Sequence, residues 1–152
     1  MEKMKELISL EAAANEWRDF LEDNDAESLI PKEKGTTKDE IADYERKKSS
    51  FDRVVKAISR GFVIIDKGVV TQRLKYPIGA EAVTDKLVFD QRILAKDREE
   101  VMSGINADDP SQALLAQRRL CAKLTGVNDA ILGKLDFSDV KITDSIVSVF
   151  FM

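Results

Sequence analysis

The chain has no histidine and only one cysteine, Cys121, among its 152 residues. Histidine is the commonest general base and metal ligand near neutral pH, so its absence argues against most acid–base and zinc chemistry. A single cysteine cannot form an intrachain disulfide, which favours a reducing compartment. We therefore expect a cytoplasmic protein that is not an enzyme and that holds no metal ion or cofactor.

Long apolar runs are also missing. No segment approaches the roughly 20 apolar residues needed to cross a bilayer, and Glu2 and Glu6 interrupt the start of the chain, where a secretory signal would be apolar. Lys and Arg are interleaved with Asp and Glu, and the net charge is −4. A nucleic-acid-binding protein would gather its cations into a stripe that neutralises phosphates. We therefore expect no membrane, nucleic acid or small-molecule substrate among the partners.

Apolar residues before Gly61 recur at helical intervals of three and four, which predicts two helices. Their seams are Leu7, Leu10, Ala14, Trp17 and Leu21 in the first helix, and Ile41, Tyr44, Phe51, Val55 and Ile58 in the second. Thr37 and Glu40 form a capping-box pattern, and Gly61 suits a left-handed stop after Arg60. The breaker-rich stretch 23–37 lets the chain reverse. Residues 1–60 are thus predicted to form a helical hairpin.

After Gly61 the apolar period changes from helical to alternating. Segments 62–65 and 69–78 are rich in β-branched and aromatic residues, and Gly68 between them suits a tight hairpin turn. A third alternating run, 86–94, completes a predicted antiparallel sheet of about three strands. The face of the second strand that we expect to be buried comprises Val70, Leu74, Tyr76 and Ile78. With helices covering this sheet, the fold class is α+β and mainly helical.

Capping residues mark helices after the sheet. A short helix is predicted at 96–102, and a longer one starts at Pro110 behind the cap Asp109 and stops at Gly126. Cys121 belongs to its apolar face and is interpreted as a core thiol. A short helix follows near Asn128. Segment 138–151 alternates like a strand at 140–143 but also repeats its apolar residues every four positions, and we predict a helix there.

The change of pattern near Gly61 also indicates the domain organisation. We predict a helical hairpin module at 1–60 and an α+β domain with C-terminal helices at 61–152, with one compact domain overall as the alternative.

The order of elements from about Val69 to Phe151 resembles the tail assembly chaperones of tailed bacteriophages and prophages. Their C-terminal halves often have a helix ending in Leu-Thr-Gly, a short helix leading to Leu-Asp, an Asp pair, and a last helix ending in Phe. The matching residues here are Leu124, Thr125, Gly126, Leu135, Asp136, Asp139 and Phe150. The hairpin before Gly61 has no counterpart in the short members of that family.

The resemblance implies a chaperone that binds the long, helical tape measure protein in the host cytoplasm and keeps it soluble while the tail tube assembles. Self-association is a second expectation. The residues predicted to contact the partner are Leu132, Leu135, Phe137, Val147, Phe150 and Phe151. The alternative is a cytoplasmic helical adaptor or regulatory protein-binding domain unrelated to tails.

Overall fold

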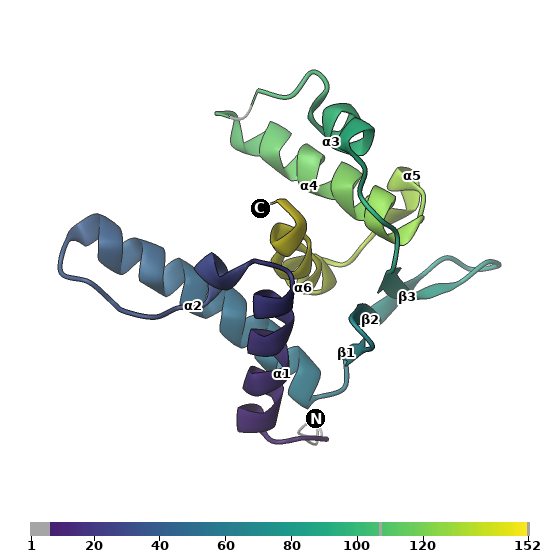
Figure 1. Ribbon diagram of the computed structural model, residues 1–152. Coiled ribbons are helices and arrows are strands. Elements are labelled where there is room, and N and C mark those ends of the chain that lie inside the picture. Colours follow the sequence, from purple (N-terminus) through teal and green to yellow (C-terminus); the bar gives the residue numbers. More distant parts are fainter. Residues whose placement is uncertain (1–6, 107, 152) are drawn as a thin grey trace.

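A computed structural model of the chain describes residues 7–106 and 108–151, and it has an α+β fold (Figure 1). Helices precede and follow a small antiparallel sheet whose strand order is β1-β2-β3, and the hairpin of β2 and β3 projects from one side of the molecule (Figure 1). The elements in chain order are α1 (Leu10–Asp23), η1 (Glu27–Leu29), α2 (Lys38–Ser59), β1 (Val63–Asp66), β2 (Val69–Ile78), β3 (Thr84–Phe89), α3 (Ala95–Met102), α4 (Pro110–Thr125), α5 (Asp129–Leu132), α6 (Phe137–Val147) and η2 (Ser148–Phe151).

The N-terminal hairpin forms as predicted, with side-chain caps at both helix starts. The Ser9 hydroxyl accepts a hydrogen bond from the Ala12 N–H in α1, and the Thr37 hydroxyl accepts one from the Glu40 N–H in α2. In a capping box the Glu40 carboxylate would accept a hydrogen bond from the N–H of Thr37. Here it accepts one from the N–H of Thr36, the preceding residue. Gly61 adopts φ 80° directly after the C-cap of α2, which is the left-handed stop that the sequence predicts.

The predicted seams are buried over only part of each helix. In α1, Leu10 is exposed, and Leu7 precedes the helix. In α2 the buried residues begin at Phe51. The first half of α2 projects away from the rest of the molecule (Figure 1), so Tyr44 on that half is only half-buried. A helix seam can be buried only where a second element reaches it.

A two-residue turn of Lys67 and Gly68, both with positive φ, joins β1 to β2. The pairing of β2 with β3 is irregular between Arg73 and Ile78. This shift turns the Tyr76 side chain to the surface, so its predicted place on the buried face is wrong.

The third strand also differs from its predicted bounds of 86–94. It starts at Thr84 and ends at Phe89, because the chain then leaves the sheet. The N–H of Gln91 donates to the carbonyl of Leu124 at the end of α4, at 3.0 Å, instead of to a strand.

The structure confirms the predicted caps of α4 and the helical form of the last segment. Asp109 caps α4, Pro110 is its first residue, and Gly126 ends it with φ 70°. The capping-box pattern of Asp109 and Gln112 also predicts that the Gln112 side chain returns to the cap residue, but its oxygen instead accepts a hydrogen bond from the N–H of Asn106. Asp136 caps α6, whose first turn follows directly.

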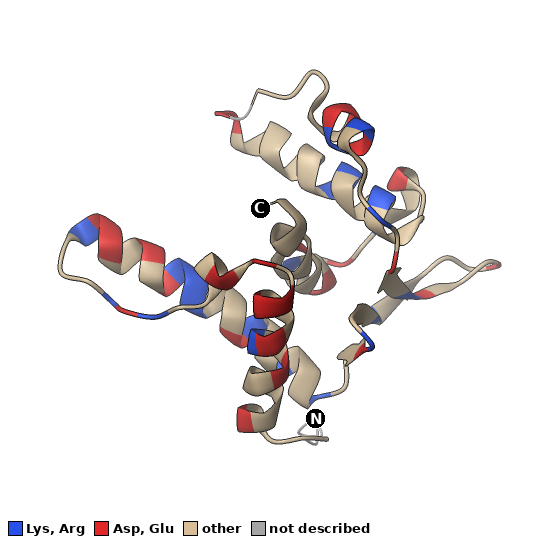
Figure 2. Ribbon diagram, in the orientation of Figure 1, with Lys and Arg blue, Asp and Glu red and all other residues tan. Residues whose placement is uncertain are grey.

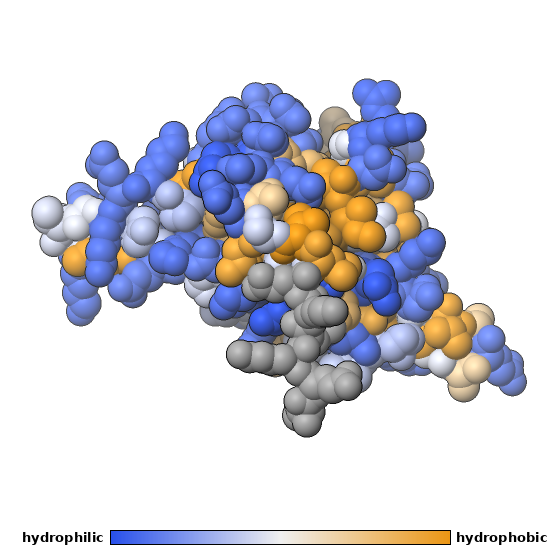
Figure 3. All heavy atoms as spheres, turned by 90° about the horizontal axis from the view of Figure 1, so that it is seen from below, coloured by the Kyte–Doolittle hydropathy of each residue, from blue (hydrophilic) through white to orange (hydrophobic). Residues whose placement is uncertain are grey.

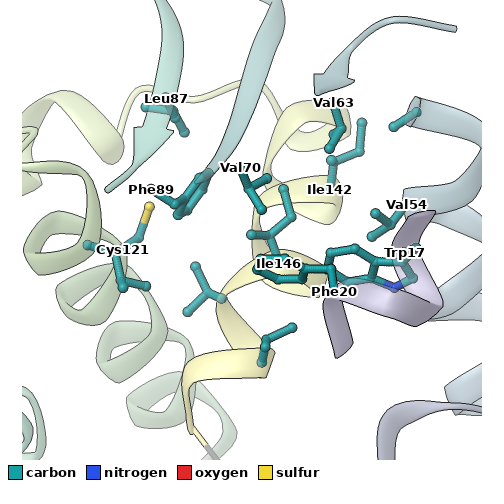
Figure 4. Packing of buried hydrophobic residues seen from close by; sticks show 14 of the residues in the cluster. Trp17, Phe20, Val54, Val63, Val70, Leu87, Phe89, Cys121, Ile142 and Ile146 are labelled. Atoms are coloured by element: carbon teal, nitrogen blue, oxygen red, sulfur yellow. The ribbon is translucent and has the colours of Figure 1, made fainter. Parts of the chain in front are cut away.

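Helix α6 is the central element of the core, and it contacts α2, α4 and β2 (Figure 1). In Figure 4, Ile146 lies between Phe20 on one side and Val70 on the other, while Cys121 lies close to Phe89. The buried apolar residues of the hairpin, sheet and C-terminal helices belong to one cluster. The hairpin and the sheet therefore share a core built around α6.

A buried polar network also joins α6 to β2. The Asp139 carboxylate accepts the backbone N–H groups of Lys75 and Tyr76 at 2.9 and 3.1 Å. The Gln72 amide donates to the Asp139 carbonyl at 3.0 Å, and the Thr143 hydroxyl donates to the Gln72 side-chain oxygen at 2.7 Å. Asp139 therefore satisfies the two N–H groups that lie in the irregular part of β2.

Candidate functional site

The six residues predicted to contact a partner do not form one surface. Leu132 and Val147 are buried in the core, so in this conformation Val147 offers no surface to a partner. Leu135, Phe150 and Phe151 are half-buried. Phe137 is 72 % exposed and is the most exposed large apolar side chain among the described residues.

Three of the six line one hollow between α4, α5 and α6. Its volume is about 280 Å³, and Leu132, Leu135 and Phe137 form one wall. The other wall belongs to α4 and includes Leu114, whose side chain is 60 % exposed. An exposed Leu and an exposed Phe thus stand at the rim of the same hollow, each forgoing the roughly 1.5–3 kcal/mol that burial of such a side chain provides.

A second hollow continues along α4 and contains another predicted residue, Phe151. Its volume is about 290 Å³, and its remaining walls come from α3, α4 and the start of η2. Gln117 of α4 lines both hollows. We call the two hollows together the α4–α6 groove. In Figure 1 the turn that follows α6 lies between α4 and α6, and Phe151 at the end of this turn lines the second hollow.

Local capping and packing explain why Phe137 is exposed. It is the first residue of α6, directly after the cap Asp136, and the helix side that faces the core starts at Asp139. The Lys141 ammonium group, one turn later, lies 4.7 Å from the centre of the Phe137 ring. This contact holds the ring against the outer side of α6 without covering it.

Unlike Phe137, Phe150 is packed against another part of the chain and is not free to contact a partner. Its ring packs edge-on against Phe20 of α1, with the centroids 6.4 Å apart, and Phe20 stacks on Trp17 at 5.3 Å. The aromatic end of the chain is therefore divided between two roles. Phe150 ties η2 to the N-terminal hairpin, and Phe151 borders the groove.

Two ionisable groups line the groove with altered pKa values. Burial raises the pKa of Asp144 to about 6, and the nearby Arg53 guanidinium opposes that rise. Burial, together with the Asp144 charge, raises the pKa of the Cys121 thiol to about 12. A thiol with such a pKa stays protonated at neutral pH, which agrees with the prediction that Cys121 is a core residue.

The raised pKa of Asp144 predicts a pH dependence of stability. The folded state keeps the proton between the ordinary pKa of 3.8 and about 6, so this residue's stabilising contribution is full below about pH 4 and is lost as the pH rises to about 6. Asp144→Asn should therefore raise the free energy of unfolding at pH 7 by about 1 kcal/mol, after allowance for the partial exposure of the group.

Urea unfolding at pH 4 and pH 7 measures this gain in the free energy of unfolding, which should be smaller at pH 4. Asp85→Asn, at an exposed position on β3, controls for net charge, and an equal gain at both pH values would contradict the prediction.

Sequence reasoning missed Leu114 as a groove residue. The apolar face that we predict from the sequence for α4 comprises Ala113, Ala116, Leu120, Cys121 and Leu124, but Ala113 is exposed and borders the second hollow. Leu114, Gln117 and Cys121 recur at intervals of three and four and form a second stripe that lines the first hollow. That spacing was visible in the sequence, although nothing showed that α5 and α6 would come to lie beside it.

A second group of exposed apolar side chains lies away from the groove, near the end of α2. The N–H of Leu7 donates to the Ser59 carbonyl at 2.7 Å, and Leu10 and Ile64 are also exposed. The view from below in Figure 3 shows apolar side chains gathered near the centre of the face, with hydrophilic ones around them. These residues supply controls for variants made in the groove.

No family model, curated protein or solved structure matches this chain. Its function must therefore be argued from its own geometry and charges.

The described residues contain no group of three or more His, Cys, Asp or Glu side chains that could hold a metal ion. Within the same part of the chain, no helix is both long enough and apolar enough to cross a membrane. The groove itself is lined mainly by apolar side chains, with Arg118 and Asp144 as its charged members. Arg118 pairs with Asp129 at 2.8 Å and thereby holds α5 against α4. This arrangement fits recognition of an apolar surface.

Proposed function

We propose that this protein is a non-catalytic binding module that holds an amphipathic helix of a larger partner in the α4–α6 groove. The observation that carries the proposal is the pair Leu114 and Phe137, which project from two different helices at the rim of one hollow. Grooves between helices receive partner helices through apolar side chains spaced by three and four residues. Leu114 and Phe137 would be covered by such a helix.

The partner class comes from the resemblance to tail assembly chaperones. We propose that the partner is a tape measure protein, bound in the cytoplasm of the host cell before the tail tube forms around it. A long helical protein exposes apolar faces until assembly, so its chaperone must cover them and later release them. A short, open groove is suited to this task, because small interfaces bind weakly and exchange readily.

Co-expression tests the proposal. The protein would be produced together with a long helical protein encoded beside its gene, and the soluble, co-purifying fraction of that second protein would be measured. Leu114→Glu places a charge in the apolar groove and is expected to lower the co-purifying fraction about tenfold or more, since anchor residues contribute 2 kcal/mol or more. Phe137→Ser should act in the same direction.

Leu10→Glu is the matched control. It makes the same substitution at a leucine that is 45 % exposed on α1, in the group of apolar residues away from the groove. Unchanged co-purification with Leu10→Glu and loss with Leu114→Glu would support the groove. Equal loss in both variants, or a partner that stays soluble alone, would contradict the proposal. Binding through the groove to a protein unrelated to tails would support the adaptor alternative.

A further inference from the structure

A hollow of about 210 Å³ lies on the other side of α6, and five cations surround it. Arg53, Lys56 and Arg60 come from α2 and its C-cap, Lys75 from β2 and Lys141 from α6. The floor includes the apolar side chains of Ala57, Phe62 and Ile142. None of the described residues that line this hollow is acidic. We call it the basic hollow.

The cations converge because three elements distant in the sequence meet here. Residues 53, 56 and 60 are spaced by three and four, so their side chains lie on one side of the α2 helix. The network of Asp139 with the backbone of Lys75 fixes β2 against the first turn of α6. Lys141 is exposed on that helix, half a turn from Asp139. The spacing of the three α2 cations is visible in the sequence, but nothing in it shows that Lys75 and Lys141 lie beside them.

Among the described residues, none of the five cations forms a close ion pair with a carboxylate, although the charge of Arg53 acts on Asp144 and that of Lys75 acts on Asp136. Other cations of the described chain form ion pairs, such as Lys48 with Asp52 at 2.7 Å, but none of these five does. The closest acid in the sequence to Lys141, Asp139, directs its carboxylate to backbone N–H groups of β2. The chain as a whole has four more acids than bases, so the positive charge of this hollow is a local feature, and a bound anion would reduce the repulsion among its cations.

Contacts with uncharged groups hold several of these cations in place. The Lys75 ammonium lies 5.3 Å from the centre of the Phe62 ring, and Lys141 lies 4.7 Å from that of Phe137. An Arg53 nitrogen donates to the Ser145 hydroxyl at 3.3 Å. These contacts order the side chains and leave their positive charges available. An ordered group of cations loses less conformational entropy when it binds a ligand.

We propose that the basic hollow binds a compact, multiply charged oxyanion of the phosphate type. Arg and Lys donors arranged around a concave site match the oxygens of a phosphoryl or pyrophosphoryl group. The cations gather around one small hollow, which favours a compact anion over a nucleic-acid backbone, because a backbone needs a continuous track of cations. Elsewhere on the ribbon, red and blue segments are mixed along α2 and α3, while α1 is mostly acidic (Figure 2).

Titration calorimetry with pyrophosphate, in a low-salt buffer free of phosphate and sulfate, tests the proposal. Binding with one site per chain is expected, together with a rise in the melting temperature as pyrophosphate is added. The double variant Lys56→Ala/Lys141→Ala should bind at least about tenfold more weakly. Lys86→Ala/Lys96→Ala removes the same charge from two exposed lysines outside the hollow, and it should bind pyrophosphate as the unmodified protein does.

Three results would overturn the proposal. The first is no binding of pyrophosphate at millimolar concentration. The second is equal weakening in both double variants, which would show a response to net charge alone. The third is a salt-sensitive dimer that forms without pyrophosphate and is lost in Lys56→Ala/Lys141→Ala, because the occupant would then be an acidic segment of a second copy. Leu114→Glu lies outside the basic hollow and should leave pyrophosphate binding unchanged, so this site and the groove can fail separately.

Discussion

Asp139→Ala is expected to lower the free energy of unfolding by about 3 kcal/mol. The side chain is fully buried, and its two oxygens accept the N–H groups of Lys75 and Tyr76. Those two donors lie where the β2–β3 ladder is irregular. Alanine would leave both without an acceptor, and each buried donor that loses its partner costs about 1–3 kcal/mol. The loss of these two bonds should also loosen β2 from α6, although the Gln72 amide keeps its bond to the backbone carbonyl of residue 139.

Guanidinium unfolding followed by circular dichroism measures the effect. Asp136→Ala is the matched control, because it removes an aspartate from the start of the same helix. Asp136 is exposed and bonds to the N–H of Ser138 as the α6 cap, so its loss should cost only about 1 kcal/mol. A cost for Asp139→Ala no greater than that of the control would show that the buried network does not hold β2 in place.

Trp17→Ala is expected to lower the free energy of unfolding by about 3–5 kcal/mol, the usual cost of removing a large buried aromatic side chain. Trp17 is 2 % exposed, stacks on Phe20, and through Phe20 supports Phe150 of η2. The substitution should therefore loosen both the N-terminal hairpin and the C-terminal turn. Trp17→Phe keeps an aromatic ring in the same position and should cost clearly less.

Hydrogen exchange at the amides of η2 provides the second measurement for this prediction. Faster exchange in Trp17→Ala than in Trp17→Phe would show that α1 holds the C-terminal turn in place. Unfolding curves of the two variants that coincide would contradict the packing described here, and unchanged exchange in η2 would show that Phe150 does not depend on the hairpin.

The two proposed sites lie on different sides of α6. Phe137 and Asp144 line the groove, whereas Ser138 and Ile142 line the basic hollow. Lys141 links them, since it borders the hollow and contacts the Phe137 ring. Ligands in the two hollows would therefore contact the same helix, whose buried residues start at Asp139. Leu114→Glu changes the groove alone, whereas Lys56→Ala/Lys141→Ala changes the basic hollow and also removes the contact of Lys141 with Phe137.

The predictions from the sequence were most accurate where the cause is local. Asp109, Pro110 and Gly126 bound α4 because capping and left-handed φ depend on the immediate backbone. The alternating pattern located all three strands, and the four-residue repeat of Ile142 and Ile146 correctly indicated a helix. The predictions failed where burial depends on a distant partner. Tyr76 turned outward at an irregular ladder, and Val147 lies in the core although its segment ends the chain.

By itself, the sequence determined the α+β class and the order of helices and strands. These properties follow from local backbone preferences, apolar period and composition. Only the tertiary structure decided which surfaces remain open. Leu114 and Phe137 share a hollow, and five cations surround another, because α6 brings together α2, α4 and β2. Contacts between residues far apart in the chain have no periodic signal in the sequence, so both sites became visible only in the folded protein.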